Sequence, residues 1–396
     1  MPEVARSILR NLRWRPFASL RISAFDEAQG RLVGSRFAHA RKAAQVRFPV
    51  ALPNFSPYSS YSSLIIASAM KQSRRSVVKG KNAAGISDAR PERKRVRGMA
   101  RGLTLLTMRR RGQYRLGVKT DKGILDVSEA ARILGKPAPA TVDDLLQDED
   151  GPSLNALVDA ALKTKAARAA FMKEEEVEYG PVVTRPEKIV CVGLNYRRHA
   201  KEVNMAIPSQ PVLFNKFNNA LSAHDQPIKL PVEVATKFDY ETELVIVMGK
   251  TAKNVSEADA LSYVAGYCTG NDFSARDLQF DTGGQWMVGK TPDQFAPLGP
   301  YLVTADQVNP DKLKIECRVN GEIRQSSNTD DFIFNTAKIV SYISRLMTLK
   351  PGDIIFTGTP EGVILGYPKE RQVWLKAGDK IACSVEKLGV LRFELI

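Results

Sequence analysis

The sequence predicts an α+β protein whose larger, C-terminal part is mainly β. From Arg185 onward, short apolar runs typical of strands alternate with Gly, Pro, Asn and Asp, the residues that favour turns. Between residues 102 and 180, short alternating runs stand beside segments of helical periodicity. We therefore expect a small α+β domain at residues 99–180 and a mainly β domain with few helices at residues 181–396.

Charge separates the front of the chain from the rest. Residues 1–100 hold 20 Lys and Arg against 5 Asp and Glu, which accounts for the whole net charge of +15. The remaining surface is balanced and does not attract polyanions, so we expect no nucleic-acid partner. We expect residues 1–98 to be a disordered basic extension. It is open whether this is a tail that contacts nucleic acid, an organelle transit peptide, or the product of an upstream start codon.

Apolar runs and cysteines indicate the compartment. The longest apolar runs, such as Leu244–Met248, are far shorter than the roughly 20 residues that span a bilayer, so we expect no membrane helix. None of the four cysteines belongs to a C-x-x-C pair, and each lies in an apolar, strand-like stretch. We therefore expect no disulfide framework and no zinc site. A reducing, cytoplasmic location fits, or a mitochondrial one if residues 1–98 are a transit peptide.

The small domain is expected to begin with a strand at Thr104–Met108. Tyr114–Lys119 and Gly123–Val127 alternate on either side of a short turn, which predicts a β-hairpin. Ser128–Leu134 and the Ala-rich Leu154–Met172 have the periodicity of helices.

The larger domain is expected to contain eight short strands and two helices. The expected strands are Lys188–Val192, Pro211–Phe214, Leu244–Met248, Tyr263–Thr269, Leu313–Val319, Asp353–Thr357, Lys380–Val385 and Val390–Leu395. The expected helices are Val255–Ala260 and Ile333–Met347. No repeat of fixed period is present, which argues against a solenoid or propeller.

Acidic residues next to two of these strands are candidate metal ligands. Glu241 and Glu243 are two residues apart at the head of a strand, and this spacing places both carboxylates on one face. Neighbouring carboxylates repel each other unless a cation or a proton lies between them. Oxygen ligands of this kind suit Mg²⁺, Mn²⁺ or Ca²⁺. The alternative is a solvated strand face. Asp272, which closes the next strand, could be a third ligand or the N-cap of a following helix.

Two further motifs carry candidate catalytic groups. His199 and Glu202 are three residues apart, so on a helix they share one face, and a carboxylate that orients an imidazole makes a general base. The alternative is an exposed amphipathic helix. Lys290 stands between Gly and Thr-Pro on an expected loop, where it could neutralise a carboxylate or enolate, or could be an ordinary surface lysine. The small-residue turn Thr357–Gly362 could bring backbone N–H groups to an anion, or could simply connect two strands.

In combination, the order and spacing of these motifs are specific. The chain resembles the fumarylacetoacetate hydrolase family, from about Pro186 to the C-terminus. The motifs that carry the resemblance are V-G-L-N-Y (192–196), H-x-x-E (199–202), D-Y-E-T-E-L (239–244), N-D-x-S-A-R-D-x-Q (271–279), G-K-T (289–291), R-V-N-G-E-x-R-Q (318–325) and T-G-T-P-E-G-V (357–363). Residues 102–180 are similar to the small N-terminal domain of bacterial members.

The resemblance implies a mixed β-sandwich roll, usually assembled as a homodimer, with a divalent cation, Mg²⁺ or Mn²⁺ with Ca²⁺ as an alternative. It implies no membrane partner. The implied roles fall on nine residues: the metal ligands Glu241, Glu243 and Asp272, the lid dyad His199 and Glu202, the substrate-facing Lys290, and the substrate neighbours Arg276, Gln279 and Thr359.

The implied substrate is a small 2-oxo or 1,3-dioxo acid. The H-x-x-E pair favours hydrolysis of a C–C bond in a 2,4-dioxo acid of acylpyruvate or fumarylpyruvate type, with His199 activating water. Decarboxylation of oxaloacetate, or isomerisation or hydration of an unsaturated 2-oxo diacid, stays open because the same metal–enolate chemistry serves all of them. The family often has Arg where Leu194 stands and K-S-x-D where Lys290–Asp293 is K-T-P-D. These departures lie where substrate specificity is set.

Overall fold

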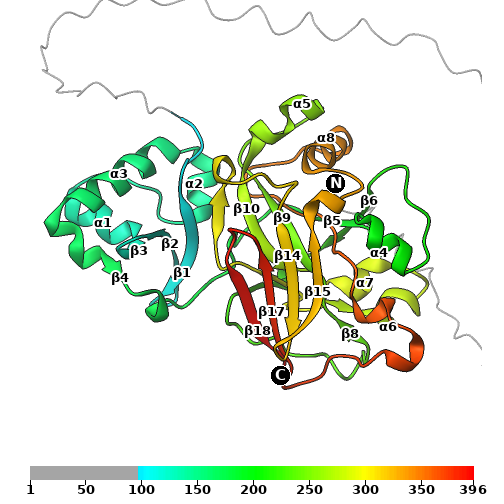
Figure 1. Ribbon diagram of the computed structural model, residues 1–396. Helices are drawn as coiled ribbons and strands as arrows, with labels where there is room; N and C mark the ends of the chain where they lie inside the picture. Colours follow the sequence, from blue (N-terminus) through cyan, green and yellow to red (C-terminus); the bar gives the residue numbers. More distant parts are fainter. Residues whose placement is uncertain (1–96) are drawn as a thin grey trace, which may run out of the picture. The chain divides into compact units, whose positions relative to one another are not determined.

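A 12-stranded mixed sheet and a 4-stranded antiparallel sheet form the centre of residues 97–396, the part of the chain that this computed structural model describes (Figure 1). The strands of the larger sheet are β1 (Thr104–Arg110), β2 (Gln113–Thr120), β3 (Gly123–Asp126), β4 (Phe171–Met172), β5 (Ile189–Gly193), β6 (Val212–Lys216), β7 (Leu221–Ala223), β9 (Thr242–Met248), β10 (Val264–Asn271), β12 (Ala296–Leu298), β13 (Leu302–Thr304) and β16 (Ile354–Phe356).

The remaining strands and the helices complete the fold. The smaller sheet contains β14 (Lys314–Val319), β15 (Glu322–Asn328), β17 (Lys380–Val385) and β18 (Val390–Glu394), and β8 (Phe238–Asp239) pairs with β11 (Ser274–Ala275). The helices are α1 (Val127–Leu134), α2 (Val142–Asp148), α3 (Gly151–Lys163), α4 (Arg197–Glu202), α5 (Glu257–Ala260), α6 (Arg276–Phe280), α7 (Trp286–Lys290) and α8 (Thr336–Leu346).

The two sheets stack as a sandwich in which β14 and β17 lie over β9 and β10 (Figure 1). Every residue of β9 is buried, because both faces of this strand are covered. By contrast, β14 and β17 alternate between buried and more exposed residues, as strands with one solvent face do. The acidic motif therefore enters the interior on a fully buried strand of the sandwich.

The small region ahead of the sandwich forms a β-meander, β1–β2–β3, with α1 and α3 packed beside it (Figure 1). Asp126 caps α1, and its side chain accepts a hydrogen bond from Glu129 N–H. Strand β1 also pairs with β13, with Thr104 opposite Val303, so the larger sheet runs without interruption from this region into the sandwich. A domain boundary near residue 180 stays a prediction, as does the extension at residues 1–98, nearly all of which lies outside the described residues.

Most predicted elements are found within one to three residues of their expected ends, including the hairpin between β2 and β3. The single helix predicted at Leu154–Met172 is wrong. Helix α3 ends at Lys163, a 3-10 segment follows at Lys165–Ala170, and Phe171–Met172 becomes β4, paired with β3. Helical periodicity did not show that the end of this segment completes a sheet. Helix α2 was not predicted.

The expectations for cysteines and membrane segments can also be compared with the structure. All four cysteines are free and buried, each within a strand, in agreement with the sequence. Among residues 97–396, no helix combines the length and apolar character needed to cross a bilayer.

Candidate metal centre and its cavity

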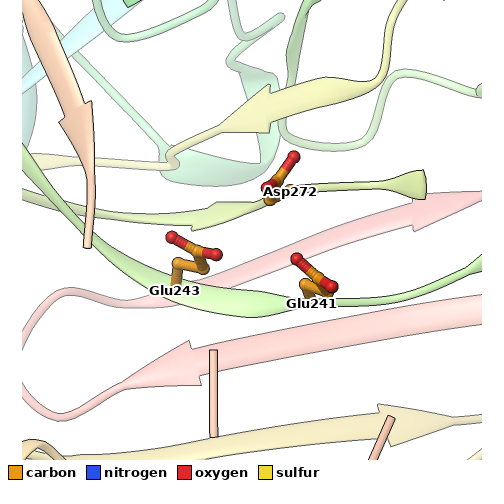
Figure 2. Close-up of side chains that lie close together, drawn as sticks. All are labelled: Glu241, Glu243 and Asp272. Atoms are coloured by element: carbon orange, nitrogen blue, oxygen red, sulfur yellow. The ribbon is translucent and has the colours of Figure 1, made fainter. Parts of the chain in front are cut away.

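Three buried carboxylates converge where β9 and β10 lie side by side. Glu241 immediately precedes β9, Glu243 is its second residue, and Asp272 directly follows β10. One oxygen from each carboxylate lies within 4.8 Å of the others. Figure 2 shows the two glutamates projecting from one strand toward Asp272 on its neighbour. The structure therefore brings together the three residues predicted as metal ligands.

Local pairing fixes this arrangement. In the antiparallel ladder of β9 and β10, Glu243 is opposite Gly270. Beyond the ladder, Asp272 N–H donates to Glu241 O at 2.9 Å, and the Asn271 side chain accepts from Glu241 N–H at 3.1 Å. The alternative role of Asp272 as a helix N-cap is wrong, because α6 begins at Arg276 and its N-cap is Ala275. The carboxylate of Asp272 is thus directed into the acidic cluster.

Two buried lysines neutralise part of this negative charge. Lys290 Nζ lies 2.6 Å from Glu241 Oε2 and 2.9 Å from Asp272 Oδ2. Lys216 Nζ lies 2.6 Å from Asp272 Oδ1 and also donates to the backbone carbonyls of Phe273, Phe295 and Lys290. Lys290 is the last residue of α7 rather than part of a loop, and it is only 2% exposed, so it is not an ordinary surface lysine.

Arg276 connects the acidic cluster to a fourth buried carboxylate, Asp239. Its Nη2 lies 2.8 Å from Asp239 Oδ2 and 2.6 Å from Glu241 Oε1. Its Nη1 donates to Gln279 Oε1 at 2.9 Å, so the two predicted substrate neighbours contact each other. Asp239 in turn accepts the N–H groups of Ile364 and Leu365, at 2.9 and 3.1 Å. This network leaves Arg276 little freedom to move.

The site contains four buried carboxylates and three buried basic side chains, so with every group ionised it carries one excess negative charge. Burial acts to raise the pKa of Glu241, but Lys290 and Arg276 outweigh it and hold that pKa at about 2. Burial, together with Asp272 and Glu241, raises the pKa of Glu243 well above its usual range. Burial acts to lower the pKa of Lys290, but Asp272 and Glu241 outweigh it, so this lysine is held charged. The charge deficit is therefore concentrated at Glu243.

A divalent cation fits this deficit. Among the described residues, Glu243 receives one hydrogen bond, from Gly358 N–H to Oε2 at 2.7 Å, and none at Oε1. Glu243 lines the cavity, where a cation or a proton can satisfy this carboxylate. Three carboxylates supply hard oxygen donors, which suit a divalent cation such as Mg²⁺, Mn²⁺ or Ca²⁺. Glu241, Glu243 and Asp272 are the residues that would hold the ion.

The predicted dyad lies on the short helix α4. His199 Nδ1 and Glu202 Oε2 are 3.1 Å apart, and Glu202 Oε1 accepts Gly362 N–H at 2.9 Å. His199 is only 7% exposed, so the alternative of an exposed amphipathic helix is wrong at this position. With Nδ1 directed at a carboxylate, Nε2 is the ring nitrogen left for chemistry in the cavity.

The turn Thr357–Gly362 forms another wall of the site. Thr359 Oγ1 donates to Thr242 O at 2.9 Å and accepts from Gln325 Nε2 at 2.8 Å. Gly358 has a positive φ of 98°, and a Cβ there would lie 2.8 Å from Asn195 Cβ, so the turn requires glycine. The sequence predicted that backbone N–H groups of this turn could approach an anion. In the structure, Gly358 N–H donates to the carboxyl group of Glu243 in the protein itself.

These groups face one cavity of about 210 Å³. Its polar side is formed by His199, Glu241, Glu243, Arg276, Lys290 and Thr359. Its apolar side is formed by Val192, Leu194, Val203, Phe214, Phe280 and Trp286. A cavity of this size admits a small organic acid.

Two members of the network were not assigned a role from the sequence. Lys216 lies at the end of β6 within the run Val212–Phe217, and a lysine inside an apolar run is the one signal that could have marked it. Asp239 belongs to the motif with Glu241 and Glu243, but only the structure shows that it binds Arg276 rather than a metal ion.

Residues 188–396 match the family model of the fumarylacetoacetate (FAA) hydrolase C-terminal domain, so the chain belongs to this family of enzymes, which act on small organic acids. Among curated relatives, the bovine protein named oxaloacetate tautomerase FAHD2A, mitochondrial, is 43% identical over 271 residues, covering 68% of this chain and 82% of the relative. A fumarylacetoacetate hydrolase domain-containing protein 2 homolog of Dictyostelium discoideum is 52% identical over 217 residues, covering 52% of this chain and 70% of the relative.

Solved structures agree with the family assignment. A crystal structure described as a putative HpcE protein from Mycobacterium smegmatis matches with a TM-score of 0.63 and 32% identity, over 74% of this chain and 99% of that chain. Fumarylacetoacetate hydrolase from Exiguobacterium antarcticum matches with a TM-score of 0.62 and 31% identity, over 74% and 99%. The expected fold, a mixed β-sandwich roll, is therefore confirmed.

Proposed function

We propose that this protein is a divalent-metal-dependent enzyme that interconverts the enol and keto forms of oxaloacetate or a closely related 2-oxo diacid. The observation that carries the proposal is the deficit of one positive charge at Glu243, in a cavity that also holds the imidazole of His199. The names of relatives such as bovine oxaloacetate tautomerase FAHD2A support the choice of substrate.

The proposed metal ligands are Glu241, Glu243 and Asp272, and their oxygen-only chemistry favours Mg²⁺ or Mn²⁺. When bound, the ion supplies Lewis-acid polarisation of a substrate oxygen. With all four carboxylates ionised, the bound ion would leave the buried site with one excess positive charge, whereas a proton on Glu243 balances the metal-free site. The site would then attract an anionic substrate and accept the further negative charge of an enolate.

Proton transfer is assigned to the dyad and to Lys290. With Nδ1 directed at Glu202, Nε2 of His199 is the ring nitrogen that would take a proton from the carbon next to the keto group. Transfer of that proton to the enolate oxygen completes enol formation, and the reverse transfers give the keto form. Lys290, held charged by Asp272 and Glu241, stabilises the negative charge on the enolate oxygen. Arg276, fixed by Asp239, and Gln279 would bind the substrate carboxylate, with Thr359 on the facing wall.

Enol–keto conversion provides a direct test. The ultraviolet absorbance of enol-oxaloacetate would be followed with Mg²⁺ and with a chelator, and carbon dioxide release would be measured in parallel. We expect a chelator-sensitive acceleration of enol loss without matching carbon dioxide. Loss of enol at the buffer rate in both conditions would refute the tautomerase. Carbon dioxide release that matches enol loss would make the protein a decarboxylase.

Hydrolysis of a C–C bond in an acylpyruvate is the second candidate, and the His199–Glu202 contact favours it. The same imidazole could activate a water molecule, which would attack the distal carbonyl and leave pyruvate as its enolate. Chelator-sensitive pyruvate release from acetylpyruvate or fumarylpyruvate would support the hydrolase, and a protein active only on enol-oxaloacetate would exclude it. Isomerisation or hydration of an unsaturated 2-oxo diacid would release no pyruvate from either compound.

We further propose that the protein works as a homodimer. Val232, Val234 and Val373 are 62%, 63% and 75% exposed, and solvent-facing apolar side chains of this kind often mark a contact surface. An isolated β-bridge between Phe238 and Leu375 joins the two segments that carry them. Analytical ultracentrifugation would test this, with a monomer at micromolar concentration as the contrary result.

A mitochondrial location is the third proposal. Residues 1–100 are rich in Arg and poor in acids, as transit peptides are, and the bovine relative carries the word mitochondrial in its name. Fusion of residues 1–98 to a fluorescent protein should direct it to mitochondria. Diffuse cytoplasmic fluorescence would contradict the proposal.

A further inference from the structure

Helix α4 carries both members of the dyad but contains only six residues, Arg197–Glu202. So short a helix is not stable through its own hydrogen bonds. Its N-cap residue, Tyr196, makes no side-chain cap. The position of the dyad must therefore come from contacts between α4 and other segments.

Arg198 makes most of these contacts at the start of the helix. Its Nη1 lies 3.1 Å from Glu361 Oε1, and its Nη2 donates to Ser327 Oγ at 2.8 Å. Asp331 Oδ2 accepts Arg198 N–H at 3.0 Å, so a carboxylate from another segment caps the positive end of the helix. Arg197 adds hydrogen bonds to the Asp331 and Phe332 carbonyls.

The end of the helix is held by the same turn that contacts the metal ligand. Gly362 N–H donates to Glu202 Oε1, and Gly358 N–H donates to Glu243 Oε2. A Cβ on Gly366 would lie 2.4 Å from Glu202 Cδ, which shows how closely Glu202 packs on the residues after the turn. Glu361, between the two donor glycines, makes the ion pair with Arg198. One short segment thus contacts both the proposed metal centre and the dyad.

We infer that Arg198, Ser327, Asp331 and Glu361 form an ionic catch that holds α4 against the cavity, with Arg198 and Glu361 as positioning residues for His199. The kinetic consequence rests on the proposed function. The metal ligands and Lys290, which would hold the substrate, do not belong to the ionic catch. Its loss should therefore slow proton transfer more than it weakens substrate binding, and lower kcat with little change in KM.

The experiment compares Arg198→Gln, Glu361→Gln and the double variant in the full-length protein loaded with Mg²⁺. Because Arg198 and Glu361 side chains are 52% and 25% exposed, we expect a moderate fall in kcat, about three- to tenfold, in each single variant. The double variant should be about as slow as the slower single variant, because the two residues act as a pair. Arg198→Lys should recover part of kcat, since it keeps the charge facing Glu361.

Hydrogen exchange of the backbone amides of residues 197–203 gives a second readout that needs no activity. We expect faster exchange there in both single variants and unchanged exchange in β9 and β10. The matched control is Glu129→Gln with Arg132→Gln, an exposed 2.6 Å ion pair on α1 outside the cavity, which should change neither readout.

The ionic catch would be refuted if the backbone amides of α4 exchanged in both single variants as slowly as in the wild type. An equal increase in the exchange rate in the control variant would also refute it. Absence of chelator-sensitive activity in the wild-type protein would instead refute the proposed function, and the exchange comparison would still decide whether the ionic catch exists.

Discussion

Asp126 and Glu243 are both buried carboxylates at strand ends, yet their surroundings differ completely. Asp126, in the small region, is 1% exposed, pairs with Arg110 at 2.9 Å and Arg115 at 3.4 Å, and caps α1 through Glu129 N–H. Glu243, in the sandwich, is 2% exposed, accepts one hydrogen bond, and faces Asp272 and Glu241.

The difference shows how a structural carboxylate can be distinguished from a site residue. At Asp126 the surrounding donors already satisfy the negative charge. Their hydrogen bonds and ion pairs offset most of the free energy lost when the carboxylate is removed from water. At Glu243 the charge is left unmatched, and the raised pKa of its carboxyl records the cost. A buried carboxylate that no group of the protein neutralises is therefore a candidate ligand of a bound cation.

Replacement of Glu243 should have the largest effect. Glu243→Gln keeps the shape of the side chain but removes the unmatched charge, so we expect metal-dependent activity to fall at least about a thousandfold. Without metal the variant should be about as stable as the wild type, because the raised pKa keeps the Glu243 carboxyl protonated in the metal-free protein. Mn²⁺ titration calorimetry and thermal unfolding with a chelator would measure both.

The control for this variant is Glu316→Gln, on β14 outside the cavity, where the carboxylate pairs with Arg318 at 2.7 Å. It should bind Mn²⁺ as the wild type does. If Glu243→Gln bound Mn²⁺ as tightly as the wild type, the proposed difference between Glu243 as a metal ligand and Asp126 as a structural carboxylate would be refuted.

Loss of the imidazole should come next. His199→Asn removes the proposed base without touching a metal ligand, so kcat should fall about a hundred- to a thousandfold while Mn²⁺ affinity stays unchanged. His224, which packs against Tyr179 and contacts Arg392 outside the cavity, is the matched histidine. His224→Asn should alter stability but not kcat, and an equal fall in kcat in both variants would exclude His199 as the base.

Replacement of Asp126 should affect stability alone. Asp126→Asn weakens two ion pairs and a helix cap, so the free energy of unfolding should fall by about 1–3 kcal/mol. Urea unfolding would measure this change, and kcat per folded molecule should match the wild type. A fall in kcat at saturating metal would show that the small region contributes to the site, contrary to the comparison.

The pH dependence of metal binding should be the smallest effect. Because the pKa of Glu243 is raised, the metal-free protein holds a proton there that the metal must displace. Affinity should therefore rise with pH, about tenfold per pH unit, until the raised pKa is passed. Calorimetry in buffers of different ionisation enthalpy should detect proton release on Mn²⁺ binding. Affinity that does not change with pH would contradict the protonated state of Glu243.

Local patterns were enough for most of the fold. The alternation in β2 and β3, the apolar run of β9 and the periodicity of α1 each follow from which faces are buried. They failed at residues 164–172, because strand pairing with β3, and not local preference, decides the conformation of Phe171 and Met172. Lys216 also escaped prediction, since its partners lie far from it in the sequence, at residues 272–273 and 290–295.

By itself, the sequence identified the candidates. Residue type and a spacing of two or three predicted which side chains share a face, and the resemblance to the family, rather than spacing alone, singled out the three carboxylates and the dyad. Tertiary structure alone decided the charge balance of the site. Lys216, Lys290, Arg276 and Asp239 are brought together from distant positions, and the electrostatic cost at Glu243 depends on distances and burial that no local pattern encodes.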